Sequence, residues 1–226
     1  LRRDGADVVH APGYIGPLAA AAPVIVTIYD LIALQFPQWC RVANRLYYGL
    51  TLPWSARKAH RIIVPSAATR SDLIQRLRVP EHKIRVIPPG IDERFSPTIT
   101  VDDARVLGRY QLHQPYVLFV GNLEPKKNLA GLIRAFHLLR SGGHTAHKLV
   151  VAGRPWWAFA PLFRLVRQLG LEQEIVFTGF VPDDSLPALY RGAGLFVFPS
   201  WYEGFGLPPL EAMACGVPVI VSDRGA

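Results

Sequence analysis

The sequence predicts an α/β protein whose second half forms a doubly wound parallel sheet, and two observations carry this prediction. Short β-rich apolar runs alternate with longer helical patterns along the 226 residues. The runs of the second half are continuously apolar instead of alternating with polar residues, which is typical of parallel strands buried on both faces. Half of the residues are hydrophobic and 19% are charged, so a mainly disordered chain is excluded.

The second half has the more regular pattern. We expect its strands at 116–121, 148–153, 175–179, 195–199 and 217–221. Helices are expected between them, at 129–140, 160–169, 186–191 and about 208–215. Ligands bind such sheets at the carboxyl ends of the strands, so the residues that follow each strand are the first candidates for a functional site.

The first half is less regular. Strands are expected at 7–10, 24–28, 61–65 and 84–87, and helices at 40–58 and 67–77, the second with Ser66 as its N-cap. Residues 91–115 have the composition of a connector, with one short helix at about 102–110. We therefore place the domain boundary near residue 113, which gives domains at 1–113 and 114–226. The chain begins at Leu1 without a methionine and ends at Ala226 shortly after an apolar run, so we expect a fragment truncated at both ends.

The net charge of +8 is concentrated in the first half of the chain. Residues 1–113 carry 15 Lys and Arg against 9 Asp and Glu, whereas residues 114–226 carry 10 against 8. The basic clusters at 57–61 and 76–85 predict contact with an anionic partner such as a membrane surface. A generic basic surface is the alternative. Nucleic acid is not expected as a partner, because no nucleic-acid-binding motif accompanies the charge.

The protein is expected to be cytoplasmic, with peripheral contact to the cytoplasmic face of the membrane. Its most apolar stretch, at 17–34, is interrupted by Pro23 and Asp30, whereas a membrane span needs about 20 apolar residues in a row. The two cysteines, Cys40 and Cys215, lie far apart in the sequence and indicate neither a disulfide framework nor a zinc site. This cysteine usage indicates a reducing compartment.

A loop with two lysines follows the strand expected at 116–121. Gly121 permits a tight turn, Lys126 and Lys127 supply positive charge, and the next helix begins beyond Asn128. A helix N-terminus with lysines beside it suits a phosphate or a diphosphate. A solvated turn with Asn128 as the helix N-cap is the alternative.

Two glutamates, Glu203 and Glu211, flank a glycine-containing loop after the strand expected at 195–199. Gly204 and Gly206 allow backbone N–H groups to approach an anion closely. Glu211 is expected in the first turn of the next helix. Carboxylates at this place are unfavourable for a phosphate but accept hydrogen bonds from sugar hydroxyls. The alternative is that Glu211 only stabilises the helix N-terminus.

Tyr29 and Asp30 follow the strand expected at 24–28, and His10 ends the strand expected at 7–10. Side chains at these strand ends would face a cleft. A buried tyrosine, a turn-forming aspartate and a packed histidine are the alternatives. The sequence contains no zinc-ligand spacing, no nucleophile-elbow motif and no dinucleotide fingerprint, so no metal site is expected and a dehydrogenase is disfavoured.

Longer motifs extend along nearly the whole chain. In the second half these are YVLFVGNLEPKKN at 116–128, VFTGFV at 176–181 and LFVFPSWYEGFGLPPLEAMACGVP at 195–218. In the first half they are DVVH at 7–10, TIYDL at 27–31, RIIVPSAATRSDL at 61–73 and VIPPGID at 86–92. By these motifs the chain resembles the family 4 glycosyltransferases, which are retaining enzymes with the GT-B fold, and most closely their mannosyltransferase-like branch.

The resemblance implies two Rossmann-like domains, both incomplete here: an acceptor-side domain at 1–113 and a nucleotide-sugar donor domain at 114–226. It implies catalytic roles for Glu203 at the donor sugar and for Lys127 at the donor diphosphate. Glu211 would bind the ribose hydroxyls, and Phe180 and Val181 the nucleobase. His10, Tyr29 and Asp30 would line the acceptor-side cleft. The donor-binding residues implied by the resemblance are Gly121, Asn122, Lys126, Lys127, Phe180, Val181, Glu203, Gly204, Phe205, Gly206, Leu207 and Glu211.

By this resemblance the protein transfers a hexosyl group, mannosyl or glucosyl, from a GDP- or UDP-linked sugar to a glycan or lipid-linked acceptor. No cofactor or metal is expected besides the nucleotide sugar, because lysines and backbone N–H groups can stabilise the leaving diphosphate. Asn122 and Tyr29 stand where many members of the family have Arg and His. These departures favour the alternative of a sugar-nucleotide-binding module without turnover. Another GT-B activity, such as nucleotide-sugar epimerisation, is a further alternative.

Overall fold

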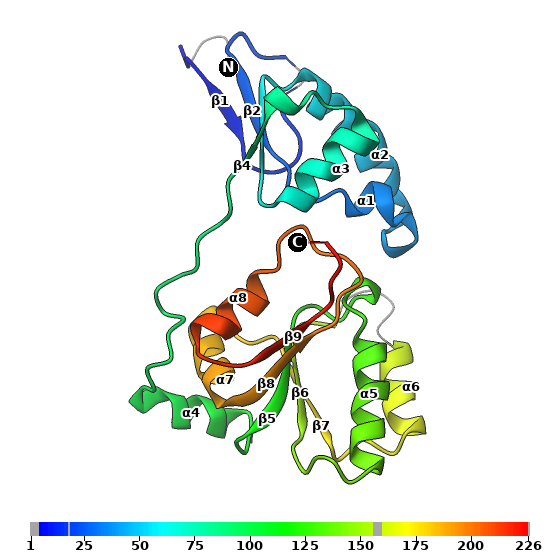
Figure 1. Cartoon of the computed structure of the whole chain (residues 1–226), viewed down its shortest axis with the longest axis vertical. Helices are drawn as coiled ribbons and strands as arrows, with labels where there is room; N and C mark the ends of the chain where they lie inside the picture. Colours follow the sequence, from blue (N-terminus) through cyan, green and yellow to red (C-terminus); the bar gives the residue numbers. More distant parts are fainter. Residues whose placement is uncertain (1–4, 18, 156–159, 226) are drawn as a thin grey trace. The chain divides into compact units, whose positions relative to one another are not determined.

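The structure is a computed structural model that describes residues 5–17, 19–155 and 160–225. Leu1 and Ala226, on which the expected truncation rests, lie outside the described residues. Contacts between residues divide the chain into two compact units, whose helices and strands are drawn in Figure 1. Unit 1 comprises Leu1–Gly90, Tyr202–Phe205 and Arg224–Ala226, and unit 2 comprises Ile91–Trp201 and Gly206–Asp223.

Unit 1 is built on a parallel sheet whose described strands follow the order β1-β2-β3-β4. Three α-helices connect these strands, and the side chains of Val26, Ile62 and Leu73 are fully buried in the core. The strands are β1 (Val9–Ala11), β2 (Val24–Thr27), β3 (Arg61–Val64) and β4 (Ile84–Val86). The helices are α1 (Ile32–Gln35), α2 (Val42–Lys58) and α3 (Ala67–Leu77), with 3-10 helices η1 (Pro37–Trp39) and η2 (Glu81–Lys83).

The elements that the sequence predicted for unit 1 lie within a few residues of their predicted positions, whereas α1 was not predicted. α3 has the predicted bounds, because Ser66 Oγ accepts a hydrogen bond from Thr69 N at 3.1 Å and so caps the helix as expected. The helix expected from residue 40 begins only at Val42, because Arg41 is still extended and residues 37–39 form the separate helix η1.

Unit 2 contains the doubly wound parallel sheet that the sequence predicted. Its described strands follow the order β7-β6-β5-β8-β9, and every neighbouring pair is parallel. The strands are β5 (Tyr116–Val120), β6 (Leu149–Ala152), β7 (Ile175–Gly179), β8 (Ala193–Phe198) and β9 (Val219–Val221). The helices are α4 (Val101–Arg109), α5 (Leu129–Ser141), α6 (Ala160–Gln168), α7 (Leu186–Gly192) and α8 (Leu207–Ala214), with η3 (Pro125–Lys127) and η4 (Asp183–Ser185).

The central strands of unit 2 are buried on both faces. All four residues of β6 are buried, and so are the adjacent residues Leu118 and Phe119 of β5. Adjacent side chains of a strand point to opposite faces of the sheet, so both faces are covered. α5 and α6 lie side by side, as Figure 1 shows. No helix within the described ranges is long and apolar enough to cross a membrane.

The division by contacts places residues 91–113 in unit 2, whereas the sequence placed the boundary near residue 113. α4 lies in this region and packs against α7. Arg191 Nε of α7 donates to Asp103 Oδ2 of α4 at 2.6 Å, and Arg191 Nη2 donates to Asp103 Oδ1 at 2.7 Å. The two side chains are only 7% and 8% exposed. A segment with the composition of a connector therefore carries a buried ion pair with a helix distant in the sequence.

We expect Asp103→Ala to lower the free energy of unfolding by about 3–5 kcal/mol, because the Arg191 guanidinium then stays buried without its partner. The Arg191 guanidinium holds the pKa of Asp103 below its ordinary value. The stabilisation of the folded state by the ionised Asp103 carboxylate is therefore present above about pH 4 and is lost as the pH falls through the lowered pKa. Urea unfolding at several pH values measures both effects.

Asp102→Ala is the matched control for this prediction. Asp102 lies on the same helix but pairs with Arg105 at the surface, where its side chain is 65% exposed. Its loss should change the free energy of unfolding by less than about 1 kcal/mol. Equal destabilisation by the two substitutions would contradict the importance of the buried pair.

Candidate functional site

The carboxyl edge of the sheet of unit 2 holds a pocket of about 150 Å³. Four of the predicted donor-binding residues, Gly121, Asn122, Phe180 and Val181, are brought together in its lining. This is the position that the rule for parallel sheets predicts for a ligand. The lining consists of residues at the ends of β5, β6 and β7 and of residues leading into α7: Val120, Gly121, Asn122, Ala152, Gly153, Arg154, Phe180, Val181, Asp183 and Leu186.

A close backbone approach joins the strand ends at this edge. Gly121 N donates to Ala152 O, and Gly153 N donates to Gly179 O, each at 2.9 Å. A Cβ atom on Gly153 would lie 1.9 Å from Gly121 O, where no side-chain atom fits. Glycine at position 153 is therefore required for the ends of β5 and β6 to meet at the pocket.

Arg154 is a residue of this pocket that the sequence analysis missed. Its guanidinium carbon lies 4.0 Å from the centre of the Phe180 ring, which is a cation–π contact. The Phe180 side chain is 53% exposed, whereas the neighbouring Val181 is buried. Arg154 lies two residues after β6, and Phe180 directly follows β7, so the rule of strand ends was the signal that could have identified Arg154. An arginine and a phenylalanine stacked on each other offer planar surfaces to a planar ligand.

The loop with two lysines brings charge to the same edge. Lys127 is buried, with Nζ 4.5 Å from the centre of the Phe198 ring. A Cβ atom on Gly121 would lie 3.6 Å from Lys127 Cε, so the lysine side chain reaches the pocket edge. Lys126 Nζ lies 3.9 Å from Glu124 Oε1, and this carboxylate balances part of the charge of the loop. The buried side chain of Lys127 therefore lies beside the end of β5.

Asn128 occupies the N-cap position of α5, as in the alternative interpretation of this loop, but its side chain does not cap the helix. Asn128 has left-handed backbone angles, with φ at 53°, and its side chain makes no capping hydrogen bond. A capping side chain needs an extended backbone at the N-cap, which Asn128 does not have. Residues 125–127 form η3 immediately before it, and this helical turn sets the entry into α5.

Glu211 lies in the second turn of α8, not in the first turn as predicted, because the helix begins at Leu207. Tyr190 OH of α7 donates to Glu211 Oε2 at 2.7 Å. Burial raises the pKa of the Glu211 carboxyl above its ordinary value, and the hydrogen bond from Tyr190 opposes this in part. The interaction of a charge with the helix dipole falls off beyond the first turn. The alternative that Glu211 only stabilises the N-terminus of α8 is therefore not supported. A carboxylate held in this way keeps acceptor capacity for ligand hydroxyls.

Glu203 and Glu211, which flank the glycine-containing loop after β8, belong to different units. Gly206 precedes α8 and Leu207 is its first residue, and both group with Glu211 in unit 2. Glu203, Gly204 and Phe205 group with unit 1. A Cβ atom on Gly204 would lie 2.0 Å from Tyr29 O, so close packing within unit 1 requires glycine here. The sequence assigned this glycine only to the approach of an anion.

Tyr29 and Asp30 follow β2 at the carboxyl edge of the sheet of unit 1. His10 does not end its strand as predicted, because β1 continues to Ala11 and His10 is its middle residue. Asp30 Oδ2 accepts a hydrogen bond from Tyr14 OH at 3.0 Å, and Asp30 Oδ1 accepts one from the backbone N–H two residues further on, also at 3.0 Å. The Tyr29 ring packs edge-on against Tyr14, with 5.8 Å between ring centres, and stays partly exposed. His10 Nε2 and Thr27 Oγ1 are 2.9 Å apart. Tyr29 and Asp30 therefore meet around Tyr14, and His10 pairs with the neighbouring strand.

Comparison with known families identifies the class of protein to which this fold and the pocket of unit 2 belong. The family described as glycosyl transferases group 1 matches residues 108–226, which is more than half of the chain. The chain therefore belongs to this family. A second family, described as glycosyltransferase family 4, matches residues 1–95. The resemblance found in the sequence motifs is confirmed.

The chain is similar to individual proteins of related function names and to solved structures. The O-antigen chain mannosyltransferase B of Escherichia coli is 35% identical over 223 residues, which are 98% of this chain and 58% of that protein. Mannosylfructose-phosphate synthase of Agrobacterium fabrum is 33% identical over 75% of this chain and 39% of that protein. Anabaena Alr3699/HepE, solved in complex with UDP and glucose, has a TM-score of 0.73 at 24% identity over 90% of this chain and 54% of that chain.

The likeness to solved structures establishes the fold. Sucrose-phosphate synthase from Thermosynechococcus elongatus has a TM-score of 0.78 at 23% identity, over 99% of this chain and 58% of that chain. At such identities the likeness shows the fold alone, and the predicted GT-B class of α/β fold is confirmed. The chain spans 58% of the length of the mannosyltransferase B relative.

The raised pKa of Glu211 predicts a pH-dependent gain of stability in Glu211→Gln. A carboxyl whose pKa is raised in the folded state makes the wild type less stable as the pH rises through that pKa. We expect the variant to melt at a higher temperature than the wild type at neutral pH. The difference should vanish below about pH 4, where the carboxyl is protonated in both states.

Thermal unfolding at several pH values measures this difference. Glu172→Gln changes an exposed glutamate of the same unit and serves as the control, with no expected shift at any pH. A Glu211→Gln variant that is less stable than the wild type at neutral pH would contradict the assignment of a costly buried charge.

Proposed function

We propose that this protein is a retaining glycosyltransferase that transfers a hexosyl group from a nucleoside-diphosphate sugar to a glycan or lipid-linked acceptor. The observation that carries the proposal is the pocket at the carboxyl edge of unit 2, which combines exposed planar side chains with a buried lysine beside it. The names of the relatives, a mannosyltransferase and a mannosylfructose-phosphate synthase among them, support a hexosyl donor.

The donor nucleotide is proposed to bind within unit 2. A planar nucleobase suits the pocket of Arg154, Phe180 and Val181, because its faces can stack on the exposed ring or on the guanidinium. The diphosphate suits Lys127, since a buried ammonium group attracts an anion more strongly than an exposed one. Glu211 accepts hydrogen bonds from the ribose hydroxyls. Gly121 and Asn122 line the same pocket as Phe180 and Val181.

The chemistry of the proposal is the departure of a nucleoside diphosphate from the donor sugar. Lys126, Lys127 and the backbone N–H groups of Gly206 and Leu207 stabilise the negative charge that develops on the leaving group. In this proposal no protein-bound metal ion is required for that step. Glu203 is assigned to the sugar, where a carboxylate stabilises the positive charge that develops on the ring. Tyr29 and Asp30 are assigned to the acceptor side.

The proposed donor is a mannosyl or glucosyl group linked to GDP or UDP. The structure of Anabaena Alr3699/HepE contains UDP and glucose, and the mannosyltransferase B relative is named for mannosyl transfer. Titration of the full-length protein with UDP, GDP and their hexose conjugates distinguishes the two bases. Nucleotide binding without release of nucleoside diphosphate on addition of acceptors would favour a binding module without turnover. Release of free nucleoside diphosphate without an acceptor would favour another GT-B activity.

The two glutamates provide the test of the proposed function, because they should affect different kinetic constants. Glu203→Gln should lower kcat by about 100-fold, since it removes charge stabilisation that strengthens in the transition state. Glu211→Gln should raise KM for the donor by about tenfold and leave kcat near the wild-type value, since the ribose does not react. Steady-state kinetics of the full-length enzyme measures both constants. The roles are misassigned if Glu203→Gln changes only KM, or if Glu211→Gln abolishes turnover at saturating donor.

We also propose peripheral docking of unit 1 on an anionic membrane. The observation behind it is that Arg57, Lys58, Arg61, Arg76 and Arg85 are all exposed within the two basic clusters of this unit. Each basic residue near an anionic surface contributes about 1 kcal/mol of attraction, and salt screens this attraction.

Sedimentation with phosphatidylglycerol vesicles tests the docking. Binding should fall as the salt concentration rises, and the double change Arg57→Glu and Arg61→Glu should weaken it several-fold. Arg164→Glu with Arg167→Glu, at exposed positions of unit 2, is the matched control and should have a smaller effect. Absence of sedimentation at low salt would remove the proposal.

A further inference from the structure

The segment Tyr202–Phe205, which carries Glu203, is held by side chains of unit 1 instead of by regular secondary structure. Residues 202–205 lie in neither a helix nor a strand. Contacts nevertheless group them with unit 1, while Trp201 and Gly206 on either side group with unit 2. The backbone position of Glu203 therefore depends on what holds its two neighbours, Tyr202 and Gly204.

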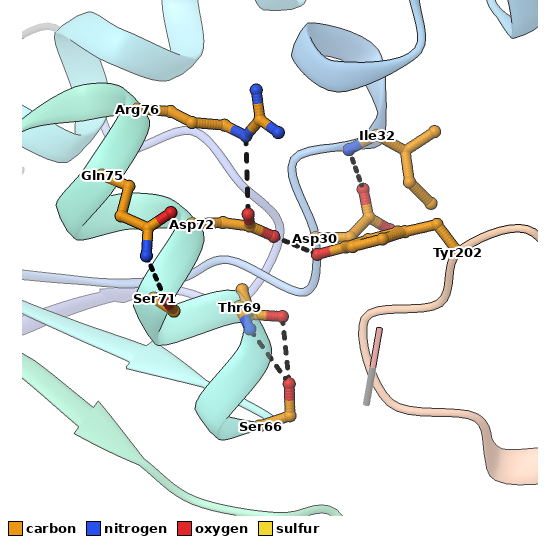
Figure 2. Close-up of polar contacts among 9 residues, drawn as sticks. All are labelled: Asp30, Ile32, Ser66, Thr69, Ser71, Asp72, Gln75, Arg76 and Tyr202. Atoms are coloured by element: carbon orange, nitrogen blue, oxygen red, sulfur yellow. Dashed lines mark hydrogen bonds and ion pairs between the residues drawn. The ribbon is translucent and has the colours of Figure 1, made fainter. Parts of the chain in front are cut away.

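Tyr202 is held by the carboxylate of Asp72. Figure 2 shows the Tyr202 hydroxyl, from the segment, pointing at Asp72 on α3, and the hydroxyl donates a hydrogen bond to Asp72 Oδ2. Asp72 Oδ1 lies 3.4 Å from Arg76 Nε one turn further along the helix, so the carboxylate is oriented from both sides. The Tyr202 ring is buried and packs on Phe36, with 5.7 Å between ring centres. Burial and the Asp72 carboxylate raise the pKa of Tyr202 well above its ordinary value, so the hydroxyl stays protonated as a donor.

Gly204 is held by two buried hydroxyls at the start of α3. Ser66 Oγ donates to Gly204 O at 2.7 Å. Thr69 Oγ1 lies 3.2 Å from Gly204 O and 3.1 Å from Tyr29 O, so its single proton bridges two backbone carbonyls. Gly204 itself lies directly against Tyr29 O, where no Cβ atom fits. Ser66 and Thr69 also form the helix cap drawn in Figure 2, so a rigid helix end provides this anchor.

We propose that Tyr202 and Thr69 are positioning residues for Glu203: anchored on Asp72 and on the start of α3, they fix the segment 202–205 and so place the Glu203 carboxylate for hexosyl transfer. This inference rests on the proposed function, and it assigns roles to residues outside the glutamate motif. A loop fixed on both sides of one residue restricts that residue to a narrow range of positions. A misplacement of a reacting group by about 1 Å can cost about 100-fold in rate.

The test uses the full-length enzyme with Tyr202→Phe and Thr69→Val, which remove one hydroxyl each and keep the shape of the side chain. Each should lower kcat by about tenfold, while the dissociation constant of the nucleoside diphosphate stays within about twofold, because the diphosphate is assigned to unit 2. Asp72→Ala should lower kcat like Tyr202→Phe, and Asp72→Asn should restore part of it, because the amide oxygen still accepts the tyrosine hydrogen bond.

Tyr116→Phe is the matched control. Its hydroxyl is also buried and donates to a backbone carbonyl, Leu189 O at 2.7 Å, but it lies in the core of unit 2. This substitution should lower the melting temperature and leave kcat unchanged. Amide hydrogen exchange at 202–205 should rise in Tyr202→Phe and not in Tyr116→Phe, whether or not the enzyme turns over.

Three outcomes would overturn the inference. The first is wild-type kcat in Tyr202→Phe or Thr69→Val. The second is a loss of kcat in Tyr116→Phe as large as in Tyr202→Phe, which would indicate a general effect of lowered stability. The third is equal hydrogen exchange at 202–205 in the wild type and in Tyr202→Phe. Absence of hexosyl transfer by the wild type would instead refute the proposed function, and with it the role given to Glu203.

Discussion

Parallel strand pairing is the constraint on which the candidate sites of both units depend. All strands of a parallel sheet end at the same edge. Strand pairing therefore brings together residues that are far apart in the sequence. In unit 2 the ends of β5, β6 and β7 bring together Gly121, Arg154 and Phe180. In unit 1 the ends of β2 and β3 bring Tyr29 near Ser66 and Thr69, which hold Gly204.

Two glycines show how tightly the backbones approach at these edges. Gly153 lies against Gly121 O in unit 2, and Gly204 lies against Tyr29 O in unit 1. In both cases a carbonyl oxygen occupies the place of a Cβ atom, so any other residue would push two segments apart. Gly153 therefore allows the strand ends of unit 2 to approach each other, and Gly204 allows the segment 202–205 to pack against Tyr29. These effects are separate from any contact with a bound anion.

Two charged groups of unit 2 lie beside aromatic rings, Lys127 buried and Glu211 half-buried. Lys127 lies over the Phe198 ring, and Glu211 accepts a hydrogen bond from the Tyr190 hydroxyl. Burial makes such charges costly in the absence of a ligand, and the same low polarity strengthens their interaction with a ligand of opposite charge or with hydroxyl donors. Asp103 and Arg191 form a further buried charged group of unit 2, in which the guanidinium donates two hydrogen bonds to the carboxylate. It stabilises the packing of α4 on α7, and it explains why a segment with the composition of a connector belongs to the unit.

The sequence by itself determined the α/β class, the order of the strands and helices, and the family. These follow from local signals: continuous apolar runs mark strands buried on both faces, Ser66 caps α3 within one turn, and the glycine and glutamate motifs lie within single loops. Gly121, Asn122, Phe180 and Val181 could be predicted for the same reason, since each directly follows a strand.

Only the tertiary structure decided which distant residues meet. The contact of Arg154 with Phe180, the hydrogen bond of Tyr190 to Glu211, and the anchoring of Tyr202 on Asp72 each join residues that local sequence patterns do not relate. The start of α8 at Leu207, which moves Glu211 into the second turn, and the left-handed Asn128 also departed from expectation. Such details depend on how whole elements pack, because the free energy of a cap, a turn or a side-chain contact is small beside that of burying the surrounding core.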